Sequence, residues 1–136
     1  MTTEGRWTVG VTWGDCDAAG IVFYPNYFKW FDAATHAFFE SIGFPHRRLQ
    51  ADFDAVGLVL VDARSSFRAP ATYGDTLLIS TTVTELGARR LVLGHRVTRG
   101  DVLICEGQEV RVFAMHGPDG RVVAQPLPEV LVDALR

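Results

Sequence analysis

Apolar and polar residues recur along the chain with two different periods, and these periods predict its elements. From Trp7 to Trp13 every second residue is apolar, which is typical of a strand. From about Pro25 to Ile42 large apolar residues recur with a period near 3.6, which predicts a long amphipathic helix with an unusually aromatic stripe. Gly43 follows directly and suits a left-handed helix cap.

The second half of the chain is strand-like. A short helix is expected at 45–53, and apolar residues then alternate with polar ones from Gly57 onward. Turns rich in Gly, Pro and Asp separate the four expected strands, which lie at 57–67, 77–86, 91–99 and 102–115. We expect Gly107 to bulge or bend the last of them. A turn at 117–120 closes a hairpin to 121–124, and a last short helix begins near Pro128.

Short turns make neighbouring strands antiparallel, so the pattern predicts an α+β fold with one antiparallel sheet of five or six strands. The long helix is expected to bury its aromatic stripe on that sheet. One main helix leaves sheet edges and a face exposed, so we also expect a homo-oligomer.

Composition narrows the class of protein. Of the 136 residues 48% are hydrophobic and 21% are charged, which is typical of a globular chain and suits one domain over residues 1–136. The formal charge of −3 disfavours a general nucleic-acid binder. Residues 1–10 lack the apolar core of a signal peptide, and no run approaches the ~20 apolar residues of a membrane helix. Since Cys16 and Cys105 belong to unrelated patterns, we expect free thiols and a cytoplasmic protein. From the charge and the lack of a long apolar run we expect neither a nucleic-acid nor a membrane partner.

The segment between the first strand and the long helix carries the candidate chemistry. Asp15 and Asp17 follow Val11 and Trp13 at every second position. If the strand continues this far, both carboxylates are therefore expected on the same, buried face as these apolar residues. Aspartates in such loops also serve commonly as caps and turn residues. A carboxylate can act on an activated acyl group, either by direct attack or by deprotonating a water.

The start of the long helix offers a complementary group. Its first turn leaves backbone N–H groups unpaired, at the positive end of the helix dipole, and these can hold a developing oxyanion. Because Pro25 has no N–H, the backbone N–H of Tyr24 is the candidate donor. A carboxylate near such a donor suits thioester hydrolysis, since a thioester carbonyl lacks strong resonance and its thiolate leaves easily.

Other reactive residues give weaker signals. Two neighbouring aspartates disfavour a Cys16 thiolate, so Cys16 is a poor candidate nucleophile. The histidines show no metal-ligand spacing, although a general base at His36 or His95 stays open; they are His36, His46, His95 and His116. We expect neither a metal nor a cofactor. Arg89 and Arg90 could bind phosphates at a strand end or form a solvated surface.

The chain resembles a known family over nearly its whole length. The strongest match is GDCDAAGIVFYPNYFKWFDAA, and looser ones follow in SFRAPATYGDTL, LGARRL and EVRVFAM. These pieces resemble hotdog-fold acyl-CoA thioesterases, in particular the 4-hydroxybenzoyl-CoA thioesterase group. The resemblance implies a long helix wrapped by an antiparallel sheet, active sites at dimer interfaces, a dimer-of-dimers tetramer and a role in aromatic degradation.

The resemblance also implies roles for individual residues. It makes Asp17, rather than Asp15, the catalytic carboxylate and places the oxyanion donor at Tyr24. It implies that Asp32 lies near the hydroxyl of an aryl group, and the alternative for this residue is a plain surface charge. It further implies that the arginine pair, Arg89 and Arg90, lies where CoA phosphates bind.

Two positions bear on the substrate. Pro25 favours the aroyl subgroup, since a neighbouring subgroup has histidine there, whereas Gly57 stands where the aroyl subgroup has tryptophan. The expected reaction is hydrolysis of an aromatic acyl-CoA, such as 4-hydroxybenzoyl-CoA or a related aroyl-CoA. The alternatives are a thioesterase for short acyl-CoA or acyl-carrier-protein substrates, and a non-catalytic acyl-CoA-binding module.

Overall fold

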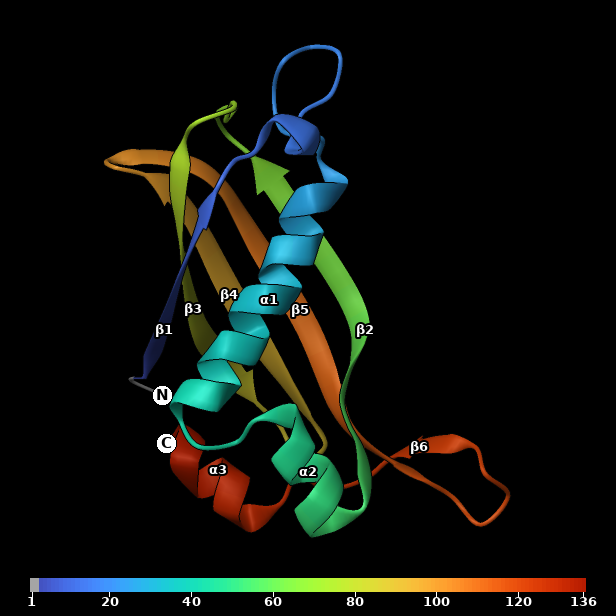
Figure 1. Ribbon diagram of the computed structural model, residues 1–136. Coiled ribbons are helices and arrows are strands. Elements are labelled where there is room, and N and C mark those ends of the chain that lie inside the picture. Colours follow the sequence, from blue (N-terminus) through green and yellow to red (C-terminus); the bar gives the residue numbers. More distant parts are fainter. Residues whose placement is uncertain (1–2) are drawn as a thin grey trace.

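The computed structural model describes residues 3–136, and within them the predicted α+β architecture is confirmed (Figure 1). The elements follow in the order β1 (Glu4–Gly10), the 3-10 helix η1 (Trp13–Asp15), α1 (Pro25–Ser41), α2 (His46–Phe53), β2 (Ala55–Phe67), β3 (Thr76–Leu86), β4 (Arg90–Arg99), β5 (Val102–His116), β6 (Val122–Ala124) and α3 (Glu129–Leu135). None of the helices among these residues is long and apolar enough to cross a membrane.

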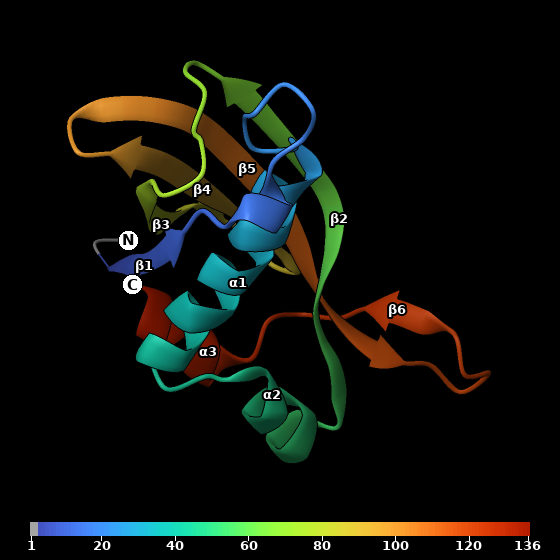
Figure 2. The ribbon, with the colours of Figure 1, turned by 45° about the horizontal axis from the view of Figure 1, so that its top comes forward.

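The strands form one antiparallel sheet in the order β1-β3-β4-β5-β2, and the short β6 pairs with the end of β5. Figures 1 and 2 show the sheet curving around α1, with α2 and α3 near the C-terminal end of that helix. The 13-residue β2 pairs with β5 on one side and forms an edge of the sheet. Its apolar side chains Leu60, Val61 and Phe67 are exposed.

The predicted aromatic stripe of α1 is buried against the sheet, as expected from its period. Its large buried side chains are Tyr27, Trp30, Phe31, Phe38 and Phe39. The predicted bulge at Gly107 is wrong, because Gly107 pairs in regular register with Ser65 on one side and His95 on the other. The glycine instead makes room for α1: a Cβ at position 107 would lie 2.4 Å from the Phe31 ring. Gly43 adopts the predicted left-handed conformation, with φ of +87°.

The first strand begins and ends earlier than its alternating pattern predicts. It ends at Gly10 because the chain turns to form η1, where the Thr12 N–H donates to Asp15 Oδ2 at 2.8 Å and the Asp15 N–H donates back to the Thr12 carbonyl at 3.1 Å. Trp13 is therefore 78% exposed and lies edge-on to Tyr73. The expected burial of Asp15 and Asp17 is also wrong, since Asp15 is only half-buried and Asp17 is exposed.

Candidate active site

The loop between η1 and α1 is held by backbone hydrogen bonds. Cys16 and Val22 form an isolated antiparallel bridge, and the Asp17 N–H donates to the Ile21 carbonyl at 2.9 Å. The Val22 N–H donates to the Ala71 carbonyl at 2.9 Å, which ties the loop to the segment before β3. The loop therefore presents Asp17 from a fixed backbone.

The two candidate carboxylates have different surroundings. The Asp15 side chain caps η1, and its carbonyl accepts from the Phe23 N–H at 2.9 Å and from Asn26 Nδ2 at 2.8 Å. Asp15 therefore holds the loop together. Asp17 accepts one hydrogen bond, from the Ala19 N–H to Oδ1 at 2.8 Å, and residues 3–136 offer no donor to its other oxygen.

Asp17 lines a hollow of about 220 Å³, here called the Asp17 hollow. The other residues of its wall are Trp13, Cys16, Gly20, Thr72 and Tyr73. The bond from Ala19 is an ordinary turn interaction, as one alternative predicted, yet it leaves the second carboxylate oxygen available to a ligand.

The start of α1 provides one unpaired donor instead of several. The Asn26 N–H donates to the Phe23 carbonyl at 2.9 Å, and the Tyr27 N–H donates to the Tyr24 carbonyl at 3.1 Å. Pro25 has no N–H to donate. Within residues 3–136 the Tyr24 N–H has no acceptor, so it is the group at this helix end that can bind an oxygen of a ligand.

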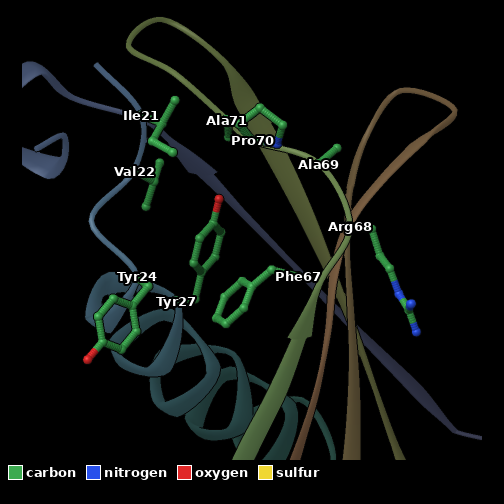
Figure 3. Close-up of a pocket in the computed structure, with 9 residues that line it drawn as sticks. All are labelled: Ile21, Val22, Tyr24, Tyr27, Phe67, Arg68, Ala69, Pro70 and Ala71. Carbon is green, nitrogen blue, oxygen red and sulfur yellow. The ribbon is translucent and has the colours of Figure 1, made fainter. Parts of the chain in front are cut away.

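Beside Tyr24 lies a largely apolar cavity of about 410 Å³, here called the Tyr24 cavity (Figure 3). It is lined by Ile21, Val22, Tyr24, Tyr27, Phe67, Arg68, Ala69, Pro70 and Ala71. The rings of Tyr27 and Phe67 lie 5.6 Å apart, and burial raises the pKa of Tyr27 to about 12. The cavity therefore offers aromatic and aliphatic walls next to an unpaired N–H.

Asp17 and Tyr24 come from the same loop but line different hollows in the chain. The sequence predicts a carboxylate near the Tyr24 donor. The two hollows adjoin, since Gly20 and Thr72 line the Asp17 hollow while Ile21 and Ala71 line the Tyr24 cavity.

Asp32 lies on α1, and its side chain is 55% exposed. Its Oδ1 accepts a hydrogen bond from Arg111 Nη2 at 2.8 Å and lies 3.5 Å from His36 Nε2. Arg111 comes from β5 and is 4% exposed, so a surface carboxylate is tied to a group in the core.

Arg111 belongs to a buried polar network that the sequence analysis missed. Glu109 Oε2 accepts from Arg111 Nη2 at 2.8 Å, while Oε1 accepts from the Thr35 hydroxyl and lies 3.0 Å from His95 Nε2. Burial opposes ionisation of Glu109, but the hydrogen bond from His95 and the charge of Arg111 lower its pKa to about 2. Burial likewise opposes the charge on Arg111, yet Glu109 and Asp32 raise its pKa overall.

A signal for this network was present in the strand pattern. Glu109 and Arg111 share the parity of the buried Cys105 and Phe113, and His95 shares the parity of neighbouring buried residues in β4. Ionisable residues on an apolar strand face are expected to be paired. His95 is a packed histidine, 1% exposed and out of reach of a substrate.

Arg89 and Arg90 lie at the turn between β3 and β4, and both are exposed. Arg90 Nη2 lies 3.5 Å from Glu85 Oε1. At about 3.3 Å per residue, the 11-residue β3 spans about 33 Å. Since β3 starts near the Asp17 loop and ends at this turn, the arginines lie at the opposite end of the folded subunit from Asp17 (Figure 1).

The remaining candidates are less suited to chemistry. The Cys16 thiol is half-buried and contacts the Thr12 carbonyl at 3.7 Å. Across residues 3–136, no three His, Cys, Asp or Glu side chains are grouped in a way that could hold a metal ion.

Comparison with known proteins identifies the family. Residues 11–135 match the Thioesterase-like superfamily. The chain is 40% identical to 4-hydroxybenzoyl-CoA thioesterase of Pseudomonas sp. (strain CBS-3) over 112 residues, which cover 78% of this chain and 79% of that protein.

Two solved structures are also similar. One is an aspartate-to-asparagine mutant of 4-hydroxybenzoyl CoA thioesterase complexed with 4-hydroxybenzoyl CoA (TM-score 0.89, 33% identity, 98% of this chain and 99% of that one). The other is a gentisyl-coenzyme A thioesterase (TM-score 0.82, 36% identity, 96% of this chain and 98% of that one). This chain therefore belongs to the Thioesterase-like superfamily of hotdog-fold proteins and is an acyl-CoA thioesterase.

Proposed function

We propose that the enzyme hydrolyses an aromatic acyl-CoA, with 4-hydroxybenzoyl-CoA or a related aroyl-CoA as substrate. The observation that carries the proposal is the unpaired Tyr24 N–H beside a cavity walled by aromatic rings. Similarity to thioesterases named for 4-hydroxybenzoyl-CoA and gentisyl-coenzyme A supports the aromatic acyl group.

In this proposal the Tyr24 N–H donates a hydrogen bond to the thioester carbonyl oxygen. The positive end of the α1 dipole lies behind that N–H and stabilises the charge that develops on the oxygen in the transition state. A single oxyanion donor of this kind is worth about 3–4 kcal/mol of the barrier. An acyl group that packs against the apolar walls of the Tyr24 cavity displaces water from them, which strengthens this interaction.

Asp17 acts as the nucleophile or as the general base. In the first route its carboxylate attacks the thioester carbonyl carbon, the C–S bond breaks, and the CoA thiolate leaves and takes up a proton. Water then hydrolyses the mixed anhydride, which releases the acid and regenerates Asp17. In the second route Asp17 takes a proton from a water that attacks the same carbon, the C–S bond then breaks, and the proton passes from Asp17 to the leaving CoA thiolate. Both routes need the carboxylate oxygen that the loop leaves unpaired.

Two further contacts complete the proposal. Asp32 accepts a hydrogen bond from the ring hydroxyl of the acyl group, since its carboxylate is exposed and fixed by Arg111. Arg89 and Arg90 bind the phosphates of CoA, because both guanidinium groups are exposed at one turn.

The site is proposed to form between chains of a homo-oligomer, a dimer of dimers. Arg89 and Arg90 lie at the far end of the chain from Asp17, so a substrate that contacts all three needs two copies. The long β2 edge and its exposed Leu60 and Val61 support such an assembly, because unpaired edges readily pair with another chain.

The test is the rate of thiol release from a matched panel of thioesters. We expect the highest kcat/KM with 4-hydroxybenzoyl-CoA or another hydroxylated aroyl-CoA, and lower values with short acyl-CoAs and with an acyl-carrier-protein thioester of the same acid. Faster release from the short acyl-CoAs or from the carrier-protein thioester would overturn the aromatic assignment. Binding without any thiol release would instead favour a non-catalytic role.

A further inference from the structure

A continuous line of polar side chains crosses the core beneath α1 and ends at the surface. It starts at Thr81, whose hydroxyl lies 2.8 Å from His95 Nδ1, and passes from His95 Nε2 to Glu109 at 3.0 Å. Arg111 Nη2 then joins Glu109 to Asp32, with both distances 2.8 Å. The first four residues are at most 4% exposed, whereas the Asp32 side chain is 55% exposed.

Arg111 is the group that links the buried part to the surface. Its Nη1 donates to the Leu58 carbonyl at 3.0 Å, and its Nη2 serves both carboxylates. Its Nε is buried and has no partner in the described part of the chain. The planar guanidinium is thus fixed at three points, and it holds one oxygen of Asp32 in a defined place. The other Asp32 oxygen has no partner among residues 3–136 and is free to accept a hydrogen bond.

Stability alone is a poor reason for this arrangement. A buried ion pair of this kind often adds little to folding free energy compared with apolar residues of the same volume. What the network does provide is a fixed orientation for the exposed Asp32 carboxylate, through its hydrogen bond from Arg111. A side chain already fixed loses less conformational freedom when a ligand binds.

We propose that Arg111, held by Glu109, is a positioning residue that sets the specificity of the enzyme for a hydroxylated acyl ring. Arg111 acts through Asp32 and does not touch the substrate. The inference rests on the proposed function, in which Asp32 accepts the ring hydroxyl.

The test compares kcat/KM for 4-hydroxybenzoyl-CoA and for benzoyl-CoA, which lacks the hydroxyl. Asp32→Asn is expected to lower the ratio of the two values at least about tenfold, the size of one hydrogen bond to a charged group. Arg111→Lys keeps a positive charge but lacks the planar fork whose two nitrogens serve Leu58 on one side and Glu109 and Asp32 on the other, so we expect it to lower the same ratio severalfold. Because Arg111 acts through Asp32, the variant that combines Asp32→Asn with Arg111→Lys should have no lower ratio than Asp32→Asn alone. A purely structural role would reduce both rates together and leave the ratio unchanged.

A matched control is available on α2. Arg48 also bonds one carbonyl and one carboxylate, Gly43 O at 2.8 Å and Asp52 at 3.1 Å, without contacting Asp32. Arg48→Lys should leave the ratio as in the unaltered enzyme. If Arg111→Lys does not fold, the double substitution Glu109→Gln with Arg111→Met removes the pair without leaving a buried charge, and should lower the ratio in the same way.

The outcomes separate the two proposals. If Asp32→Asn leaves the ratio unchanged, the role of Asp32 in the proposed function fails. If Asp32→Asn lowers the ratio but Arg111→Lys keeps it at the value of the unaltered enzyme, the role of Arg111 is wrong and that of Asp32 stands. The same conclusion holds if Glu109→Gln with Arg111→Met keeps that value.

Discussion

The ring of Phe31 lies flat on the imidazole of His95, with the ring centroids 4.9 Å apart and the planes 3° from parallel. The aromatic stripe of α1 thus covers the buried polar network and separates it from water. The same Phe31 ring fills the space above Gly107, where a Cβ would lie 2.4 Å from it. Phe31 of α1 therefore packs against both the sheet at Gly107 and the buried polar network at His95.

Gly107→Ala should destabilise the fold, because the added methyl group overlaps Phe31 in a close-packed core. We expect a loss of about 1–3 kcal/mol in the free energy of unfolding, measured by urea denaturation. Gly10→Ala is the control, since a Cβ at position 10 meets nothing within 4 Å. Equal stability of the two variants would contradict the packing described here.

Asp17→Asn should reduce turnover of the preferred acyl-CoA by several orders of magnitude while substrate binding changes little. The amide lacks the charge needed for attack or for proton removal. Single-turnover kinetics and calorimetric binding measure the two effects separately. Asp15→Asn is the matched control, because Asp15 caps η1, and it should retain most activity. Near-normal turnover by Asp17→Asn would refute the catalytic role of Asp17.

The double substitution Arg89→Ala and Arg90→Ala should raise KM for the acyl-CoA roughly tenfold, since charge-assisted bonds to phosphate are lost. It should leave the much weaker hydrolysis of the same acid's N-acetylcysteamine thioester unchanged, because that substrate has no phosphates. Arg121→Ala is the control, on a hairpin where Arg121 pairs with Asp119 at 3.1 Å. A similar loss with both thioesters would argue against phosphate binding.

Acid should weaken the fold through Glu109. Its pKa is about 2 in the folded protein against an ordinary value of 4.5, so the unfolded chain binds more protons between these values. The stability that its ionisation contributes is fully present above about pH 4.5 and is lost as the pH falls toward about 2. At about 1.4 kcal/mol per pKa unit, the difference in unfolding free energy between the unaltered protein and Glu109→Gln should shrink by about 3 kcal/mol over this range. Urea unfolding at several pH values measures it. Glu40→Gln, at an exposed position, should follow the unaltered protein throughout.

Local patterns were sufficient to predict most of the fold. The 3.6 period of α1, the two-residue period of β3 and β4, and the glycine after α1 each depend on neighbours in sequence, and all three predictions are confirmed. The strand expected to reach Trp13 ends early because the capping pair of Thr12 and Asp15 stops it, a side-chain effect that alternation does not reveal.

The candidate site was predictable only in part. The candidate donor at Tyr24 follows from Pro25, which has no N–H and is the first residue of α1. The tie between Asp32 and Arg111 joins residues 79 positions apart, so it depends on how β5 lies beneath α1. The charged residues on the apolar face of β5 predict that partners exist, but only the sheet register says which ones.

The wide separation of Asp17 from Arg89 and Arg90 along β3 has a genetic consequence. If each substrate is held by two polypeptides, a subunit carrying Asp17→Asn and a subunit carrying Arg89→Ala with Arg90→Ala each supply what the other lacks. Co-expressed in one cell, the two alleles should complement in part, because one of the two sites in each heterodimer combines an intact Asp17 with an intact arginine pair.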